Sequence, residues 1–244
     1  MWSPAPGPAT RLARLLARSL HALLPARCLL CAEAGADGLD LCAACRAALP
    51  WNRAACARCG LPLPAPEPAC GRCLRAPPAF AATFAPWVYA FPLDRLLPRL
   101  KFHGDLAAGA LVAGRMLAVA RAAPRPQALV PVPLHRQRLR ERGYDQALEL
   151  ARPLARGLGL PLRADLLRRT RATAAQSDLA AGARRRNVRG AFAVAGAGDL
   201  PAHVALVDDV MTTGATLGEC ARVLRAAGVA RVDVWVAARV PGRA

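Results

Sequence analysis

The fold is decided by the stretch His203-Val204-Ala205-Leu206-Val207-Asp208-Asp209-Val210-Met211-Thr212-Thr213-Gly214-Ala215-Thr216-Leu217. Its continuous apolar run, 204–207, is typical of a central strand in a parallel sheet. Two adjacent carboxylates follow the run, and a turn of Thr, Gly and Ala then precedes a segment with helical periodicity. A strand, a turn and a helix in this order predict one unit of a parallel α/β fold.

The segments around this stretch repeat the alternation of strand and helix. We expect strands at 84–91, 128–133, 192–194 and 231–237, and helices at 94–102, 105–121, 144–158 and 215–227. The predicted fold is therefore α/β, a parallel sheet with helices on both faces. Ligands of such sheets bind beyond the carboxyl ends of the strands, where we expect Asp208 and Asp209. The turn 212–216 would present free backbone amides and hydroxyls to a phosphate.

Eight of the nine cysteines form four C-x-x-C pairs that begin every 14 residues. One such turn can hold half of a tetrahedral metal site, so four pairs predict two structural zinc ions with no open coordination position. Equal spacing allows three combinations, and we favour the sequential one, with the first two pairs in one site and the last two in the other. A disulfide framework is the alternative, and the expected lack of a secretion signal favours zinc. The predicted ligands are Cys28, Cys31, Cys42, Cys45, Cys56, Cys59, Cys70 and Cys73.

The composition is strongly basic, with a formal charge of +18 that falls to +14 when eight thiolates and two zinc ions are counted. Arginine supplies almost all of the positive charge, which reads as a composition bias. Lys101 is the only lysine and stands out against that bias, so a compact ammonium is indicated there. Cys220, on the helix after Gly214, is expected to be a small buried residue.

Proline-rich sequence after the last cysteine pair separates the regions. We predict an N-terminal amphipathic helix in residues 1–25, a double zinc ribbon in 26–78 and an α/β domain in 79–244. The N-terminal helix is expected to dock on its own protein, with a membrane-surface helix as the alternative. No apolar run is long enough for a membrane span, and we expect a cytoplasmic protein.

The stretch Asp208 to Thr216 resembles the phosphoribosyl-pyrophosphate loop of type I phosphoribosyltransferases. The whole chain is similar to the ComF family, which is associated with DNA uptake in natural competence. That resemblance rests on the cysteine ribbons and on four further segments. The segments are Leu100–Asp105, Val130–Pro133 followed by Arg138–Gln146, Gln176–Leu179, and Arg184–Phe192. The family usually has Asn where Asp145 stands.

The resemblance implies that Asp208 and Asp209 bind the ribose hydroxyls and steady charge on the ring, which is their candidate catalytic role. It implies that Thr212, Thr213, Gly214, Ala215 and Thr216 bind the 5-phosphate, and that Mg²⁺ arrives with the pyrophosphate. The segment after Pro133 is the expected pyrophosphate loop. Its arginines are Arg136, Arg138, Arg140 and Arg142, with Arg138 and Arg142 as the candidate ligand contacts beside Lys101.

Three functions are compatible with these features. The first is a protein that binds phosphoribosyl pyrophosphate with Mg²⁺ and serves DNA uptake and natural transformation. The second is an active phosphoribosyltransferase, a pentosyl-transferring enzyme of nucleobase or nucleotide metabolism. The third is a zinc-ribbon adaptor that binds single-stranded DNA without catalysis and docks a helicase-like translocase. Residues 134–192 hold 14 Arg against 5 acids, a net charge of +9 that favours nucleic-acid binding.

Overall fold

The structure is a computed structural model, and it describes residues 26–172, 186–195 and 199–242. The chain divides into two compact units, residues 1–48 and 49–244. The second cysteine cluster therefore belongs to the same unit as the sheet. The predicted domain limits at 25/26 and 78/79 stay a prediction. The predicted N-terminal helix lies outside the described residues.

The described part of the first unit is a small cysteine-rich fold. An isolated antiparallel bridge joins Arg27 and Ala34. The short helix α2 (Ala43–Ala47) begins after Cys42, whose sulfur accepts a hydrogen bond from the Cys45 amide at 3.4 Å. An ion pair between Arg46 and Asp37 lies on its surface.

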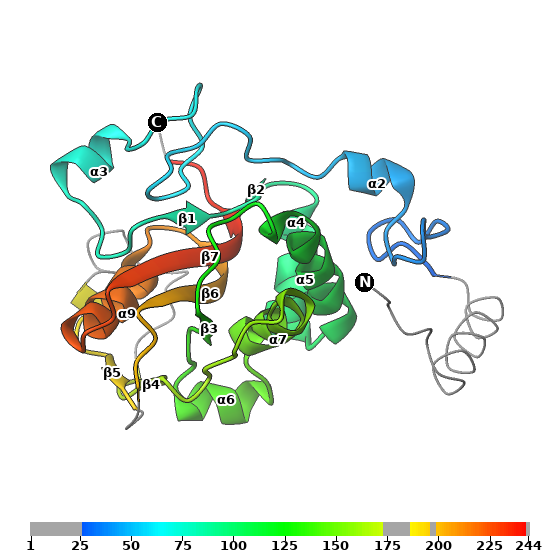
Figure 1. Cartoon of the computed structure of the whole chain (residues 1–244). Coiled ribbons are helices and arrows are strands. Elements are labelled where there is room, and N and C mark those ends of the chain that lie inside the picture. The colour runs from blue at the N-terminus through cyan, green and yellow to red at the C-terminus, as the bar shows by residue number, and fades with distance from the viewer. Residues whose placement is uncertain (1–25, 173–185, 196–198, 243–244) are drawn as a thin grey trace, which may run out of the picture. The chain divides into compact units, whose positions relative to one another are not determined.

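Four strand pairings build the five-stranded parallel sheet of the second unit (Figure 1). The central strand β6 (His203–Met211) pairs with β7 (Arg231–Arg239) on one side and with β3 (Ala128–Pro131) on the other. Because β6 is covered on both edges and both faces, its first half is the continuous apolar run that the sequence shows. The predicted last strand, 231–237, is present and extends to Arg239.

The outer edge of β7 is covered by two short strands in one continuous register. These strands are β1 (Thr83–Phe84) and β2 (Trp87–Val88), and both run parallel to β7. Pro86 lies between them and has no N–H to give to the ladder. The strand predicted at 84–91 is therefore present only as two short pieces.

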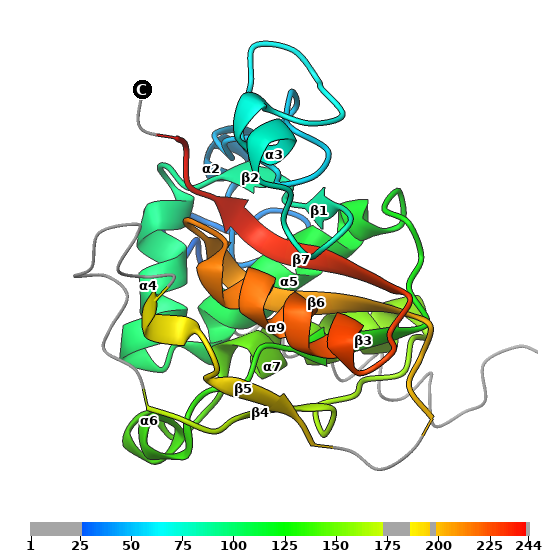
Figure 2. The same cartoon turned by 90° about the vertical axis from the view of Figure 1, so that its left-hand side faces the viewer.

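Helices cover both faces of this sheet, as predicted. Helix α9 (Ala215–Ala226) lies on one face, and α7 (Gln146–Leu158) packs on β6 and β3 from the other (Figures 1 and 2). Helix α5 (Leu106–Ala120) packs on α7, and α4 (Leu93–His103) packs on α5. Helix α4 confirms the helix predicted at 94–102 and contains Pro98 in its interior.

The described part of the second unit has four further elements. Helix α6 (Arg136–Arg142) follows β3. Helix α3 (Gly71–Arg75) follows Cys70 in the second cysteine cluster. Strands β4 (Leu167–Arg169) and β5 (Phe192–Val194) form a separate antiparallel pair. Strand β5 was predicted from the sequence, but β4 was not.

The core of the second unit extends into the cysteine cluster. Cys56, Cys59, Cys70 and Cys73 belong to the same buried cluster as side chains from β3, β6, β7 and α9. Cys220 is fully buried on α9, as predicted. The metal-ligating residues of this ribbon are thus part of the hydrophobic core that supports the sheet.

Candidate functional site

The two acids lie inside a strand and not after it, which corrects the prediction. The ladder of β6 with β3 ends at Val207, but the ladder with β7 continues to Met211. Asp208 and Asp209 therefore lie where β6 still pairs with β7 but no longer pairs with β3. Their backbone is held by β7, while the sheet opens on the side of β3.

Asp209 faces the only lysine of the chain. Its side chain is 4% exposed, and its Oδ2 lies 3.6 Å from Nζ of Lys101 on α4. Oδ1 accepts a hydrogen bond from the Val210 amide at 2.8 Å, whereas Oδ2 is buried and has no hydrogen-bond partner. A buried carboxylate oxygen without a hydrogen bond is costly in a folded protein, so a hydrogen-bond donor placed at this oxygen would stabilise the site.

The surroundings of Asp208 disfavour the charged form of its carboxyl group. Burial raises its pKa well above the ordinary value for aspartate, and the neighbouring Asp209 charge adds to that shift. The Asp209 amide donates to Asp208 Oδ1 at 2.9 Å, and the charge of Lys101 also opposes the shift. Two adjacent carboxyls with one ammonium nearby favour the arrival of further positive charge or hydroxyl donors.

A cavity of about 350 Å³ opens beside these acids. Its walls come from α4, α6, the end of β6 and the turn that leads into α9. Nine of the ten predicted ligand-binding residues line it: Lys101, Arg138, Arg142, Asp208, Asp209, Thr212, Gly214, Ala215 and Thr216. Residues that are far apart in the sequence thus meet at one sheet edge, as the α/β interpretation predicts.

The residue directly before helix α9 must be a glycine. Gly214 has φ of +76°, and a Cβ atom there would lie 2.5 Å from Cε of Met211. Helix α9 begins directly afterwards, so its first amides are available beside the cavity.

Thr213 is the predicted residue that does not line this cavity. Its Oγ1 accepts a hydrogen bond from the Ala215 amide at 3.3 Å, and it lines a second cavity of about 650 Å³. Arg72, Cys73 and Arg189 line that second cavity as well. The turn therefore lies between two cavities. Thr213 stabilises the turn through this hydrogen bond and lines the second cavity.

The predicted pyrophosphate loop is a helix, α6 (Arg136–Arg142). Four-residue spacing places its arginines on two faces. Arg138 and Arg142 are half-buried and line the cavity, whereas Arg136 and Arg140 are exposed and do not. Arg142 also donates to Gln146 Oε1 at 2.5 Å. The four arginines therefore form two pairs. Arg138 and Arg142 are the cavity pair, and Arg136 and Arg140 are the solvent pair.

Asp145 has a structural role at the start of α7. Its Oδ1 accepts hydrogen bonds from the amides of Ala147 at 2.9 Å and Leu148 at 3.2 Å. Its Oδ2 accepts from the Leu134 amide at 3.0 Å, which ties the β3–α6 connection to α7. Burial raises the pKa of Asp145 in spite of these three donors. The acid is thus a helix cap and a loop anchor.

Four aromatic or polar residues that line the cavity were missed as site residues. Phe102 and Gln146 lie within the segments that carry the family resemblance, so a signal for them existed. Tyr89 follows β2, and Arg169 ends β4, with its guanidinium 5.3 Å from the centre of the Phe192 ring. Neither has a local sequence pattern that points to the cavity.

The cysteines form two clusters in the predicted sequential pairing. One contains Cys28, Cys31, Cys42 and Cys45, and the other contains Cys56, Cys59, Cys70 and Cys73. The sulfur atoms of Cys31 and Cys42 lie 3.6 Å apart, and those of Cys59 and Cys70 lie 3.8 Å apart. Four sulfurs about 2.3 Å from a zinc ion form a tetrahedron with edges of about 3.8 Å, so both clusters fit zinc.

Thiol acidity differs within each cluster, because burial and neighbouring thiols raise the pKa of Cys45 and of Cys73. Burial opposes the charged thiolates, but backbone hydrogen bonds lower the pKa of Cys28 to about 6 and that of Cys70 to about 7. In the described ranges, no other group of three or more His, Cys, Asp or Glu side chains is close enough to hold a metal. Asp208 and Asp209 are not part of such a group.

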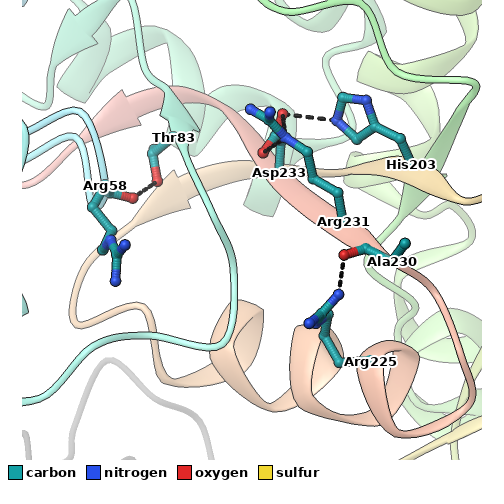
Figure 3. A network of polar contacts seen from close by, with 7 residues as sticks. All are labelled: Arg58, Thr83, His203, Arg225, Ala230, Arg231 and Asp233. Carbon is teal, nitrogen blue, oxygen red and sulfur yellow. Dashed lines mark hydrogen bonds and ion pairs between the residues drawn. The ribbon is translucent and has the colours of Figure 1, made fainter.

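His203 forms an ion pair at the opposite end of the sheet. Its Nε2 lies 2.8 Å from Asp233 Oδ2, and Arg231 Nε donates to the same carboxylate at 3.1 Å (Figure 3). These residues start β6 and β7, away from the cavity. Of the segments carrying the resemblance, Gln176–Leu179 and residues 184–185 lie outside the described residues.

Comparison with known proteins agrees with this architecture. Residues 19–74 match the double zinc ribbon domain. The chain is 38% identical to competence protein F of Haemophilus influenzae over 159 residues, which cover 62% of this chain and 69% of the relative. It is 35% identical to the DNA utilization protein YhgH of Escherichia coli K12 over 175 residues, which cover 68% of this chain and 75% of the relative.

The fold and the cysteine clusters define a parallel α/β protein with a double zinc ribbon, which holds structural zinc in two four-cysteine sites. The similarity to competence protein F and to the YhgH proteins covers most of both chains. The chain belongs to the ComF family. None of the helices in the described part has the length and apolar character needed to cross a membrane.

Proposed function

We propose that this protein binds phosphoribosyl pyrophosphate with Mg²⁺ in the cavity beside Asp208 and serves DNA uptake. The observation that carries the proposal is the buried Asp209 Oδ2, which has Lys101 nearby and no hydrogen-bond partner. A ribose hydroxyl would donate to such an oxygen. The names of the relatives, a competence protein and DNA utilization proteins, support the cellular role.

Each wall of the cavity suits one part of this ligand. Asp208 and Asp209 would bind the two ribose hydroxyls, and the turn 212–216 would bind the 5-phosphate through amides and hydroxyls. Lys101, Arg138 and Arg142 would neutralise the pyrophosphate. The Mg²⁺ ion, when bound, would offset the pyrophosphate charge.

Calorimetry with phosphoribosyl pyrophosphate and Mg²⁺ tests the binding proposal. We expect saturable binding by the wild type and none by Asp208→Asn/Asp209→Asn. Ribose 5-phosphate alone should bind more weakly, because it lacks the group that Arg138 and Arg142 would contact. Equal affinity of both proteins for the pyrophosphate compound would contradict the proposal.

Helix α6 favours single-stranded DNA as a second partner. Its solvent pair, Arg136 and Arg140, is exposed on the face turned away from the cavity residues. Phosphate contacts from such arginines predict binding that weakens steeply with salt. We expect Arg136→Gln/Arg140→Gln to weaken DNA binding and leave ligand affinity unchanged. The matched variant Arg138→Gln/Arg142→Gln should weaken ligand binding, so the two pairs control for each other.

The cavity also has a surface for a nucleobase, which favours transferase activity as an alternative. Phe102 is 66% exposed although it lines the cavity, and Tyr89 lines it too. In a transfer, a base nitrogen would bond to the ribose C1 while the bond from C1 to pyrophosphate breaks. Pyrophosphate release should then appear with at least one base and fall in Phe102→Ala. No release with any base would leave a binding protein or the DNA-binding adaptor, with a helicase-like translocase as the proposed protein partner.

A further inference from the structure

Arg239 connects the second cysteine cluster to the turn that lines the cavity. It is the last residue of β7 and is only 1% exposed. Its Nε donates to the carbonyl of Cys59 at 2.9 Å. Its Nη1 donates to the carbonyls of Met211 at 3.1 Å and Thr212 at 2.6 Å. The Arg239 side chain thus donates hydrogen bonds to the backbone of Cys59, a predicted zinc ligand, and to the backbone of Met211 and Thr212 at the start of the turn.

The surroundings of Arg239 make this contact hard to replace. Nη1 also donates to the Val240 carbonyl at 2.5 Å, so the guanidinium serves four backbone acceptors. No carboxylate pairs with it among the residues that the structure describes. Four thiolates around one zinc ion carry a net formal charge of about −2. The filled cluster therefore supplies the negative charge that a buried arginine needs.

The Cys56–Cys59 turn is also fixed to the edge of the sheet. Thr83 on β1 donates through its hydroxyl to the Arg58 carbonyl at 2.8 Å (Figure 3). The Thr83 amide donates to the Ala57 carbonyl at 3.0 Å. Movement of this turn on loss of metal would therefore reach β7 and Arg239 directly. The first cluster belongs to the other compact unit.

We propose that Arg239 is a positioning residue through which the metal of the second cluster holds the Met211–Thr216 turn in its binding conformation. The identity of the bound ligand rests on the proposed function above, but the coupling of metal to turn does not. The second cluster lies in the same compact unit as the cavity, whereas the first cluster lies in the other unit.

Hydrogen–deuterium exchange of the full-length protein tests the coupling without any ligand. The variants are Arg239→Gln, Cys70→Ser in the second cluster, and Cys42→Ser at the equivalent place in the first. We expect faster exchange of a peptide covering 208–217 in Arg239→Gln and Cys70→Ser, and wild-type exchange in Cys42→Ser. A peptide from α7 is the internal control. Unchanged exchange at 208–217, or a rise equally large in α7, would overturn the proposal.

Ligand binding then separates this inference from the proposed function. If the wild type binds phosphoribosyl pyrophosphate, its affinity should fall about tenfold in Arg239→Gln and Cys70→Ser, a usual size for coupling between two sites. Cys42→Ser should stay within about twofold of the wild type. Metal analysis should still find zinc in Arg239→Gln, which shows that the loss arises at the turn. If the wild type binds nothing, the proposed function fails while the exchange result still decides the coupling.

Discussion

Replacing Lys101 by Met should remove the one positive charge that faces the buried Asp209. Across 3.6 Å, two unit charges attract by about 4–5 kcal/mol at an effective dielectric constant of about 20. The Lys101 side chain is 38% exposed, so water screens the pair and lowers its net value. We therefore expect a coupling energy of about 1–2 kcal/mol between the two side chains.

A double-mutant cycle of Lys101→Met and Asp209→Asn measures this coupling. The free energy of unfolding can be followed in urea by the fluorescence of Trp87 and Trp235, which are buried in the second unit. Lys101→Met should be destabilising in the wild-type background and close to neutral in Asp209→Asn. Arg99→Met is the matched control, because Arg99 lies on the same helix and pairs with Asp105. A Lys101–Asp209 coupling below about 0.3 kcal/mol, or an equal coupling for Arg99, would refute the reasoning.

Three further predictions concern Asp208, Asp145 and the two cysteine clusters. Because the pKa of Asp208 is raised, this carboxyl keeps a proton in the folded state that it loses in the unfolded state between pH 3.8 and its raised pKa, so its contribution to the stability of the ligand-free protein should fall as pH rises through that window. Asp208→Asn should flatten this dependence in pH-resolved urea titrations; an unchanged slope would count against it. Asp145→Ala should cost about 2–3 kcal/mol of unfolding free energy, since three amides lose their acceptor, and Asp145→Asn should cost less. Cys31→Ser and Cys59→Ser should each reduce zinc from two ions to one by metal analysis, but only Cys59→Ser should lower the unfolding midpoint seen by tryptophan fluorescence.

Much of the site was predictable because its parts are local patterns. The apolar run of β6, the turn at Gly214 and the C-x-x-C pairs each lie within a few residues. Their geometry follows from backbone periodicity and ligand spacing. Lys101 was found because it stands alone in an arginine-rich composition.

The errors arise where a distant neighbour decides the outcome. β7 extends β6 beyond the apolar run, so Asp208 and Asp209 lie inside a strand. The segment after Pro133 was expected to be a loop, but its arginines form a helix, and only two of them face the cavity. Arg169 reaches the cavity from β4, which the sequence pattern did not show.

The sequence alone was enough to predict two four-cysteine metal sites and a parallel sheet in which two adjacent acids precede a tight turn and a helix. Cysteine spacing and hydrophobic periodicity are enough for both, because each depends on neighbours along the chain. Only the tertiary structure decided that the second cysteine cluster is part of the sheet's core and that Arg239 bonds it to the turn. It also decided that Asp209 is buried beside Lys101. These contacts join residues that are distant in sequence, and their strength depends on burial, which no local pattern encodes.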